Sequence, residues 1–230
     1  IERSLIMEFK KVRLDFKYAE KGRFYRILLV PAKTKLNDLG CIFVEALHGA
    51  MAHSFCFETK DTNYDPASFL EDAFFNDDSV YMNFYSLEDL GTKFMFCYDS
   101  GDGWDFDCRV YKKSVFLDTA DVAVILEGAG QGIWEDNIGT LYKYFSGKIS
   151  PDYNGEDEKR GIYKPWNIEI DKYSDFDAPL DIEKENEDLR SLVEFTIEEY
   201  AQNEKDFIEE NEMNMLDYKT KRKLGRHLYF

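Results

Sequence analysis

Residues 93–111, KFMFCYDSGDGWDFDCRVY, contain two alternating stretches separated by a glycine-rich turn. The apolar side chains of the second stretch fall on every other position, at Trp104, Phe106, Cys108 and Val110. A period of two is typical of a β-strand with one buried face. The turn at 99–103 supplies two glycines, which adopt positive φ without strain. This stretch therefore predicts an antiparallel hairpin with an apolar inner face.

Alternation predicts further strands before this hairpin. Residues 4–18 alternate with a slip in phase, which indicates a β-bulge or a bent strand. Residues 24–31 follow a short turn and are apolar, so we expect them to return as the partner strand. Residues 53–58 predict another short strand, with His53, Phe55 and Phe57 on one face and Cys56 on the other.

Three- and four-residue apolar steps predict helices. Residues 35–50 carry such a stripe. We expect a second helix to begin near residues 134–136, with the acids Glu135 and Asp136 suited to its positive N-terminus. Residues 163–173 predict a further helix after a polar loop at 150–161. From residue 181 the chain predicts one long helix or two shorter ones.

These elements predict an α+β fold, a mixed or antiparallel sheet of hairpins packed with helices. We expect a domain over residues 1–180 and an acidic C-terminal helical extension over residues 181–230, whose end is basic. After about residue 200 apolar side chains are sparse, which leaves a solvated helix and a partner-binding arm as alternatives.

The charge of the chain restricts its partners. The chain carries 46 acidic and 29 basic residues, a formal net charge of −17. Residues 150–217 contain 22 of the acids against 7 bases, a net of −15. Such a surface repels nucleic-acid phosphates and anionic membranes, and it favours a partner protein with a basic surface. The alternative is that the acids form a solvated face and serve solubility alone.

The acids of this region form the first set of candidate binding residues. A surface of this kind resembles a phosphate backbone in charge, so the basic groove of a nucleic-acid-binding protein is one expected target. The candidates are Glu156, Asp157, Glu158, Glu183, Glu185, Glu187 and Asp188.

A second candidate set lies at the two glycine-rich turns. Asp99 and Asp102 offer carboxylate oxygens to a hard cation, next to Trp104, although acids at such positions also bond turn amides. Glu135 and Asp136 follow the stretch EGAGQG and would repel a bound phosphate, which argues against a nucleotide site.

The cysteines predict thiols rather than disulfides. Cys41, Cys56, Cys97 and Cys108 form no CxxC pair, and no apolar run is long enough to span a bilayer, so we expect a cytoplasmic protein with buried thiols. We expect no cofactor and thiols that are buried in the core, and zinc is the alternative that the sequence leaves open. A zinc site would draw its ligands from His48, His53 and the four cysteines: we expect the hairpin to bring Cys97 close to Cys108, and Cys56 or His53 to join them from a neighbouring strand.

Four segments resemble one protein family in sequence and in order. Residues 98–105, YDSGDGWD, resemble the YDFGDxWEH signature of the plasmid pRiA4b ORF-3-like family. Residues 23–30 are similar to its WRRIxVP strand, 53–57 to its HLHxF strand and 127–139 to its GEGxxPPEDxGG segment, with Phe176-Asp177 similar to its FDxxxxN tail. The resemblance covers roughly residues 5–190.

The resemblance implies a compact α+β fold that occurs on plasmids, transposons, phages and other mobile elements. Members of the family often carry histidine where this chain has Phe55 and Phe106, so a cluster of imidazoles is lost here and His53 alone remains.

No pattern identifies a catalytic nucleophile or a distinct acid–base pair. We therefore expect a non-catalytic, acidic protein that binds or regulates another protein. In a mobile-element setting, one candidate is an inhibitor of a host nucleic-acid-handling protein, of the anti-restriction or anti-CRISPR kind. The alternative is a metal-dependent enzyme or zinc-binding protein that uses His53, the strand cysteines, Asp99 and Asp102.

Overall fold

An eight-stranded sheet forms the centre of the computed structural model, which describes residues 6–71, 79–119, 122–153 and 155–219. The strand order is β5-β4-β3-β6-β7-β1-β2-β8. All neighbours are antiparallel except β4 and β5, which makes the sheet mixed. The strands are β1 (Ile6–Phe16), β2 (Tyr25–Pro31), β3 (Phe55–Glu58), β4 (Asn63–Asp65), β5 (Ser79–Tyr81), β6 (Lys93–Tyr98), β7 (Trp104–Asp118) and β8 (Val124–Ala129).

Both predicted hairpins are present. In the β6–β7 hairpin Tyr98 pairs with Trp104, and the alternating residues of β7 are buried as expected. In the β1–β2 hairpin the phase slip of the sequence corresponds to a register shift between Lys10 and Val12, where β1 pairs with β7. The bulge keeps apolar side chains of β1 on the core face on both sides of the shift.

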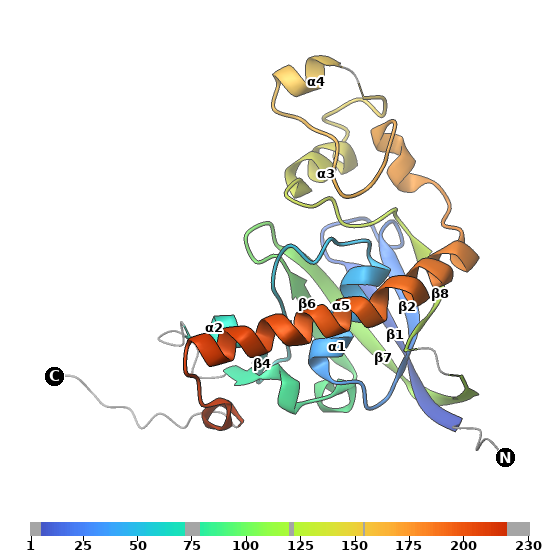
Figure 1. Ribbon diagram of the computed structural model, residues 1–230. Coiled ribbons are helices and arrows are strands. Elements are labelled where there is room, and N and C mark those ends of the chain that lie inside the picture. The colour runs from blue at the N-terminus through green and yellow to red at the C-terminus, as the bar shows by residue number, and fades with distance from the viewer. Residues whose placement is uncertain (1–5, 72–78, 120–121, 154, 220–230) are drawn as a thin grey trace.

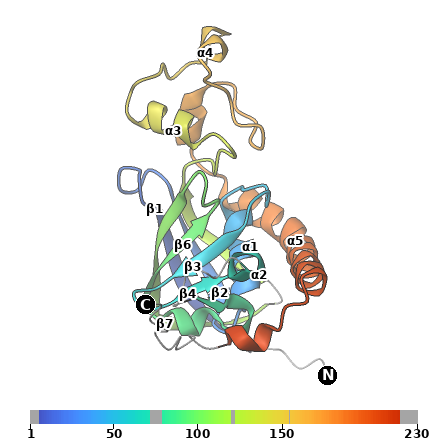
Figure 2. The same cartoon turned by 90° about the vertical axis from the view of Figure 1, so that its left-hand side faces the viewer.

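Helices lie on one face of the sheet and beyond one of its ends. They are α1 (Leu36–Ala46), α2 (Ala67–Glu71), α3 (Ile138–Phe145), α4 (Gly155–Lys159) and α5 (Ile182–Glu210), with 3-10 turns η1 (Met82–Phe84), η2 (Leu87–Leu90), η3 (Tyr173–Asp177) and η4 (Met215–Tyr218). Figure 2 shows α1 between the sheet and α5. Figure 1 shows α3 and α4 beyond one end of the sheet. The fold is therefore α+β, as the sequence predicts.

Three predictions for the middle of the chain are wrong. The helix expected near residues 134–136 begins at Ile138, because the preceding residues are bonded to the loop after α1: the Ile133 amide donates to the Leu47 carbonyl and the Ala50 amide donates to the Glu135 carboxylate. The expected loop at 150–161 contains the short helix α4. Residues 163–173 form no helix, and only the 3-10 turn η3 begins at Tyr173.

Helix α5 is continuous for 29 residues and packs against the domain. Leu189 and Val193 belong to the main core, together with the strands and α1. Farther along, Phe207 and Ile208 pack against a smaller cluster built on Leu70. The end of the helix is thus in contact with the domain despite its few apolar residues.

None of the helices in the described part of the chain combines the length and the apolarity that crossing a membrane requires.

Candidate functional site

Three loops meet at one end of the sheet and carry the candidate site. They are the loop at 48–53 after α1, the β6–β7 turn at 99–103 and the segment at 133–137 before α3. The Ile133 amide donates to the Leu47 carbonyl at 2.8 Å, which ties the third loop to the first. The Asn167 side-chain amide donates to the carbonyls of His48 and Ile133, at 2.8 and 2.9 Å.

His53 lies at the centre of these loops among carboxylates. Its Nε2 is 3.1 Å from an oxygen of Asp136, 3.5 Å from Asp99 and 3.9 Å from Glu135. The imidazole side chain is 32% exposed, so the cluster is open to solvent on one side. Nitrogen and oxygen donors of His53, Asp99 and Glu135 all lie within 4.8 Å of one another.

Glu135 is the buried member of the cluster. Its side chain is 0% exposed, and Oε1 accepts hydrogen bonds from the Tyr98 hydroxyl at 2.7 Å and the Ala50 amide at 2.6 Å. Oε2 has no hydrogen-bond partner among the described residues and faces His53. Burial raises the pKa of Glu135, and the negative charge of Asp99 adds to this, whereas the bonds from Tyr98 and Ala50 oppose it.

The remaining carboxylates are held by backbone and ring donors. Asp99 Oδ1 accepts from the amides of Gly101 and Asp102, at 3.1 and 3.2 Å, which leaves Oδ2 toward His53. Asp102 accepts from the Ile138 amide at 3.3 Å, and burial raises its pKa. The Trp166 indole donates to Asp136 at 3.2 Å. In the described chain no lysine or arginine pairs with any of these four acids.

The backbone is strained around the cluster. Of the five non-glycine residues with positive φ in the described chain, four belong to these loops: His48, Met51, Asp99 and Asp136. Each such conformation costs about 1–2 kcal/mol for an L-residue. Strain of this kind persists only where the surrounding contacts enforce it. The hydrogen bonds through Asn167 and the turn amides supply those contacts here.

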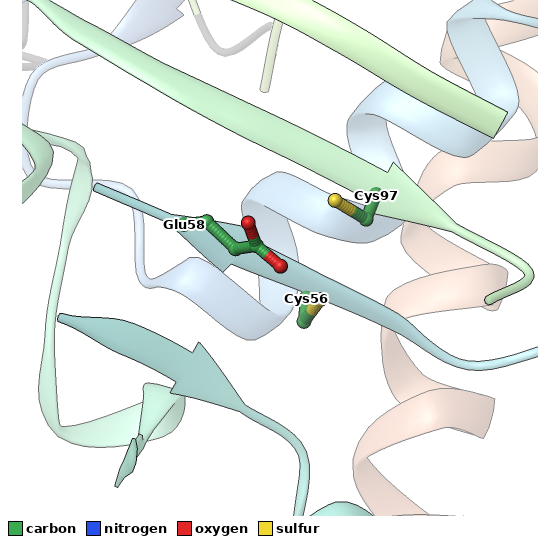
Figure 3. Close-up of side chains that lie close together, drawn as sticks. All are labelled: Cys56, Glu58 and Cys97. Carbon is green, nitrogen blue, oxygen red and sulfur yellow. The ribbon is translucent and has the colours of Figure 1, made fainter. Parts of the chain in front are cut away.

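A second group of metal-ligand types lies elsewhere, on the face of the sheet opposite the main core. Cys56 pairs directly with Cys97 across β3 and β6, and Glu58 lies two residues along β3. Figure 3 shows these three side chains together. The expected pairing of Cys97 with Cys108 is wrong, because Cys97 pairs with Asp105 and Cys108 points to the opposite face with the core.

The sequence model of the plasmid pRiA4b ORF-3-like proteins matches residues 10–179. The chain belongs to this family. The matched region contains both groups of candidate ligands and ends just before α5. The crystal structure of a protein of unknown function from Methanosarcina mazei Go1 is similar in fold, with a TM-score of 0.52 and 15% identity over 72% of this chain and 100% of that one. No curated protein matches the chain.

In this member of the pRiA4b ORF-3-like family, the family-like segments at 98–105 and 127–139 meet at His53. The structure brings together the predicted candidates Asp99, Asp102, Glu135 and Asp136. Glu135 and Asp136 do not cap α3 as expected, since Asn137 occupies that position and Glu135 turns inward. Trp104, the other predicted candidate of the turn, is 0% exposed in the aromatic core and is not a surface contact.

The acidic candidates of the second half are only partly on the surface. Asp157 is buried, and Glu185 is buried with its carboxylate 2.7 Å from His48 Nε2. The others are exposed or half-buried on α4 and α5: Glu156, Glu158, Glu183, Glu187 and Asp188.

Sequence reasoning missed the residues that position the cluster. Tyr98, Trp166 and Asn167 have polar atoms bonded to its members, yet each resembles ordinary core or loop residues in the sequence. The available signal for Tyr98 was its position one residue before the acidic turn, on the inner face of β6. The phenylalanines at 55 and 106 also lie on this inner face, where they pack in the core.

Proposed function

We propose that the protein binds a divalent cation through His53, Asp99 and Glu135. The observation that carries this proposal is the buried Glu135 Oε2, which has no hydrogen-bond partner among the described residues and faces an imidazole and a second carboxylate. A buried polar atom without a partner costs about 1–3 kcal/mol, and more if it is charged. A cation at this point would remove that cost.

The donor set favours Mn²⁺ or Zn²⁺. One imidazole and two carboxylates form a mixed nitrogen and oxygen set, which suits these ions better than Mg²⁺, whose sites are built from oxygen and water. Three protein donors leave coordination positions for water, as in catalytic rather than purely structural zinc sites. The proposal therefore includes metal-assisted chemistry at the solvent-open side of His53.

The test is Mn²⁺ binding to the purified protein, followed by the electron paramagnetic resonance signal of the free ion. Mn²⁺ is chosen because thiolates are poor ligands for it, so the cysteines do not contribute. We expect one bound ion, and an affinity at least about tenfold lower in His53→Ala and Glu135→Gln. Glu185→Gln, at the other histidine–carboxylate pair, is the matched control and should bind normally. Binding that is absent, or unchanged in both site variants, would contradict the proposal.

A second candidate function is recognition of a basic protein by the outer face of α5. The exposed residues of this helix include Leu192 at 50% and Phe195 at 66% exposure. The exposed charged residues of the helix are mostly acidic. Its three exposed bases are Lys184, Arg190 and Lys205, and its eight exposed acids are Glu183, Glu187, Glu194, Glu198, Glu199, Asp206, Glu209 and Glu210. Two exposed apolar side chains within an acidic face fit a partner surface that is basic with an apolar centre.

We propose that this partner is a protein with a basic, nucleic-acid-binding groove. We also propose that the two proteins meet in a reducing compartment such as the cytoplasm, where the four free cysteines would stay thiols. The test uses a synthetic Lys- and Leu-rich amphipathic peptide and calorimetry over a salt series. We expect binding that weakens with salt and falls in the double variant Leu192→Ser, Phe195→Ser. The matched control is Leu126→Ser, which changes an exposed leucine on β8. Equal binding by both variants would exclude this face as the site.

A further inference from the structure

The outer face of β3 and β6 carries a pair of thiols in direct register. Cys56 and Cys97 are opposite residues of these antiparallel strands. Opposed residues of an antiparallel pair have Cα atoms about 4.5–5.5 Å apart, so both side chains leave the sheet at the same point. Alternation places them on the face away from Phe55 and Phe96, which fill the core.

Glu58 adds a carboxylate to this pair. It lies two residues after Cys56, on the same face of β3. The sulfurs of Cys56 and Cys97 and a carboxylate oxygen of Glu58 all lie within 4.8 Å of one another. In the described part of the chain Glu58 forms no ion pair, so its charge faces the two thiols without a cation.

The exposure of the group allows an ion to enter. Cys56 is 8% exposed, whereas Cys97 and Glu58 are half-buried. The strands hold all three side chains on a rigid sheet, with Cys97 opposite Cys56 and Met95 opposite Glu58. A site on paired strands loses little conformational entropy when it binds a ligand.

The Cys97 thiol is poorly suited to act as a nucleophile. The hydrogen bond with Cys56, followed by burial, raises the pKa of Cys97, so the sulfur keeps its proton at neutral pH. A pair of this kind becomes anionic when a metal ion displaces the protons.

We propose that Cys56, Cys97 and Glu58 form a zinc site, separate from the His53 cluster. Two sulfurs and one carboxylate oxygen are ligands that Zn²⁺ takes, and three protein donors leave a fourth position for water. Binding forms two Zn–S bonds and one Zn–O bond, and the two thiol protons pass to solvent. No electron is transferred, so no oxidant is needed.

Thiolate ligation separates this site from the site proposed at His53. Sulfur prefers softer ions such as Zn²⁺ and the spectroscopic substitute Co²⁺, whereas His53 and its carboxylates have no sulfur to offer. A sulfur-to-cobalt charge-transfer band in the near ultraviolet therefore reports on thiolate ligation and not on the His53 cluster, and the cysteine variants assign it to Cys56 and Cys97. The band exists whether or not the His53 site binds an ion.

The experiment titrates the reduced protein with Co²⁺ and then displaces the bound Co²⁺ with Zn²⁺, in the presence of a phosphine reductant. We expect the charge-transfer band in the unchanged protein and in His53→Ala, and its loss in Cys56→Ser and in Cys97→Ser. Cys41→Ala is the matched control, since this buried cysteine lies in α1, outside the group. We expect Glu58→Gln to keep a band but to bind Co²⁺ more weakly.

Two results would overturn the proposal: no band in the reduced protein, or a band of equal strength in both serine variants. Circular dichroism of each variant without metal separates loss of the site from loss of the fold. Cys97→Ser is the decisive variant if Cys56→Ser fails to fold, because Cys97 is the less buried cysteine.

Discussion

Glu135 is costly to bury and is also a candidate metal ligand. Its carboxylate is fully buried, with one oxygen bonded to Tyr98 and Ala50 and the other without a partner in the described chain. Burial raises its pKa above the ordinary value of 4.5. The native state therefore binds a proton at Glu135 more readily than the unfolded state does, and ionisation of this group opposes folding.

This predicts a pH-dependent gain of stability in Glu135→Gln. Between pH 4.5 and the raised native pKa, the native state holds more protons than the unfolded state, so the contribution of Glu135 to the free energy of unfolding falls as pH rises. Glutamine keeps an acceptor for Tyr98 and Ala50 and has no charge. With chelator present, we expect urea unfolding to show the variant more stable at pH 7, by about 1–3 kcal/mol, and nearly equal at pH 4. Asp136→Asn, at an exposed carboxylate, is the control, and an advantage that grows toward low pH would contradict the prediction.

At this scale the sequence singled out the four acids that the structure brings together, but not how they are arranged. Asp99 and Asp102 were expected at the turn because glycines and acids mark it. Glu135 was assigned to a helix end because two acids before an apolar stretch resemble a cap. Its true environment depends on Tyr98 and Ala50, from segments 37 and 85 residues away, so no local pattern reveals it. Counting the strand pairs outward from the β6–β7 turn would have shown that Cys97 and Cys108 lie on opposite faces of the sheet.

The side chain of Asn186 joins helix α5 to strand β8. The Asn186 amide accepts from the backbone N–H of Ile125 at 2.7 Å and donates to its carbonyl at 2.8 Å. β8 is the edge of the sheet, and its free backbone groups would otherwise need water or another strand. Asn186 thus replaces a neighbouring strand at this position.

Loss of this contact should destabilise the protein without changing its helices. We expect Asn186→Ala to lower the free energy of unfolding by about 2 kcal/mol, since two hydrogen bonds to Ile125 are lost at about 1 kcal/mol each. Asn203→Ala, on the exposed side of the same helix, should change it by less than about 0.5 kcal/mol. Urea unfolding followed by far-ultraviolet circular dichroism measures both. Equal values for the two variants would show that Asn186 does not hold the sheet edge.

Elements with a strong period were predictable, and those set by tertiary contacts were not. The hairpins, α1 and α5 follow from periods of two and of three to four residues. The parallel pairing of β4 with β5 does not, because each strand has three residues and carries too little pattern to fix a partner. The sequence of residues 163–173 predicts a helix, but in the structure these residues form none before Tyr173. The side chain of Asn167 in this segment donates to the carbonyls of His48 and Ile133, which are contacts that the sequence pattern does not reveal.

The whole molecule depends on α5 more than its sequence indicates. The helix is rich in acids, and the match to the pRiA4b ORF-3-like family ends at residue 179, before the helix begins. Even so, Leu189 and Val193 are buried in the main core, and Tyr200 stacks on Phe55 with ring centres 4.8 Å apart. Removing α5 would expose α1, which lies between it and the sheet (Figure 2).

A chain that ends at residue 180 should therefore fold poorly. Burial of one leucine or valine side chain stabilises a protein by about 1.5–3 kcal/mol, so loss of Leu189, Val193 and the Tyr200 contact approaches the 5–15 kcal/mol that typically stabilise a domain. We expect this chain to unfold at much lower urea, with weak cooperativity and with binding of a hydrophobic dye. A chain that ends at residue 219 keeps α5 and η4, and it should unfold like the full chain. Equal unfolding midpoints for the two truncations would instead make residues 1–180 an independent domain, with α5 an appended helix that the core does not need.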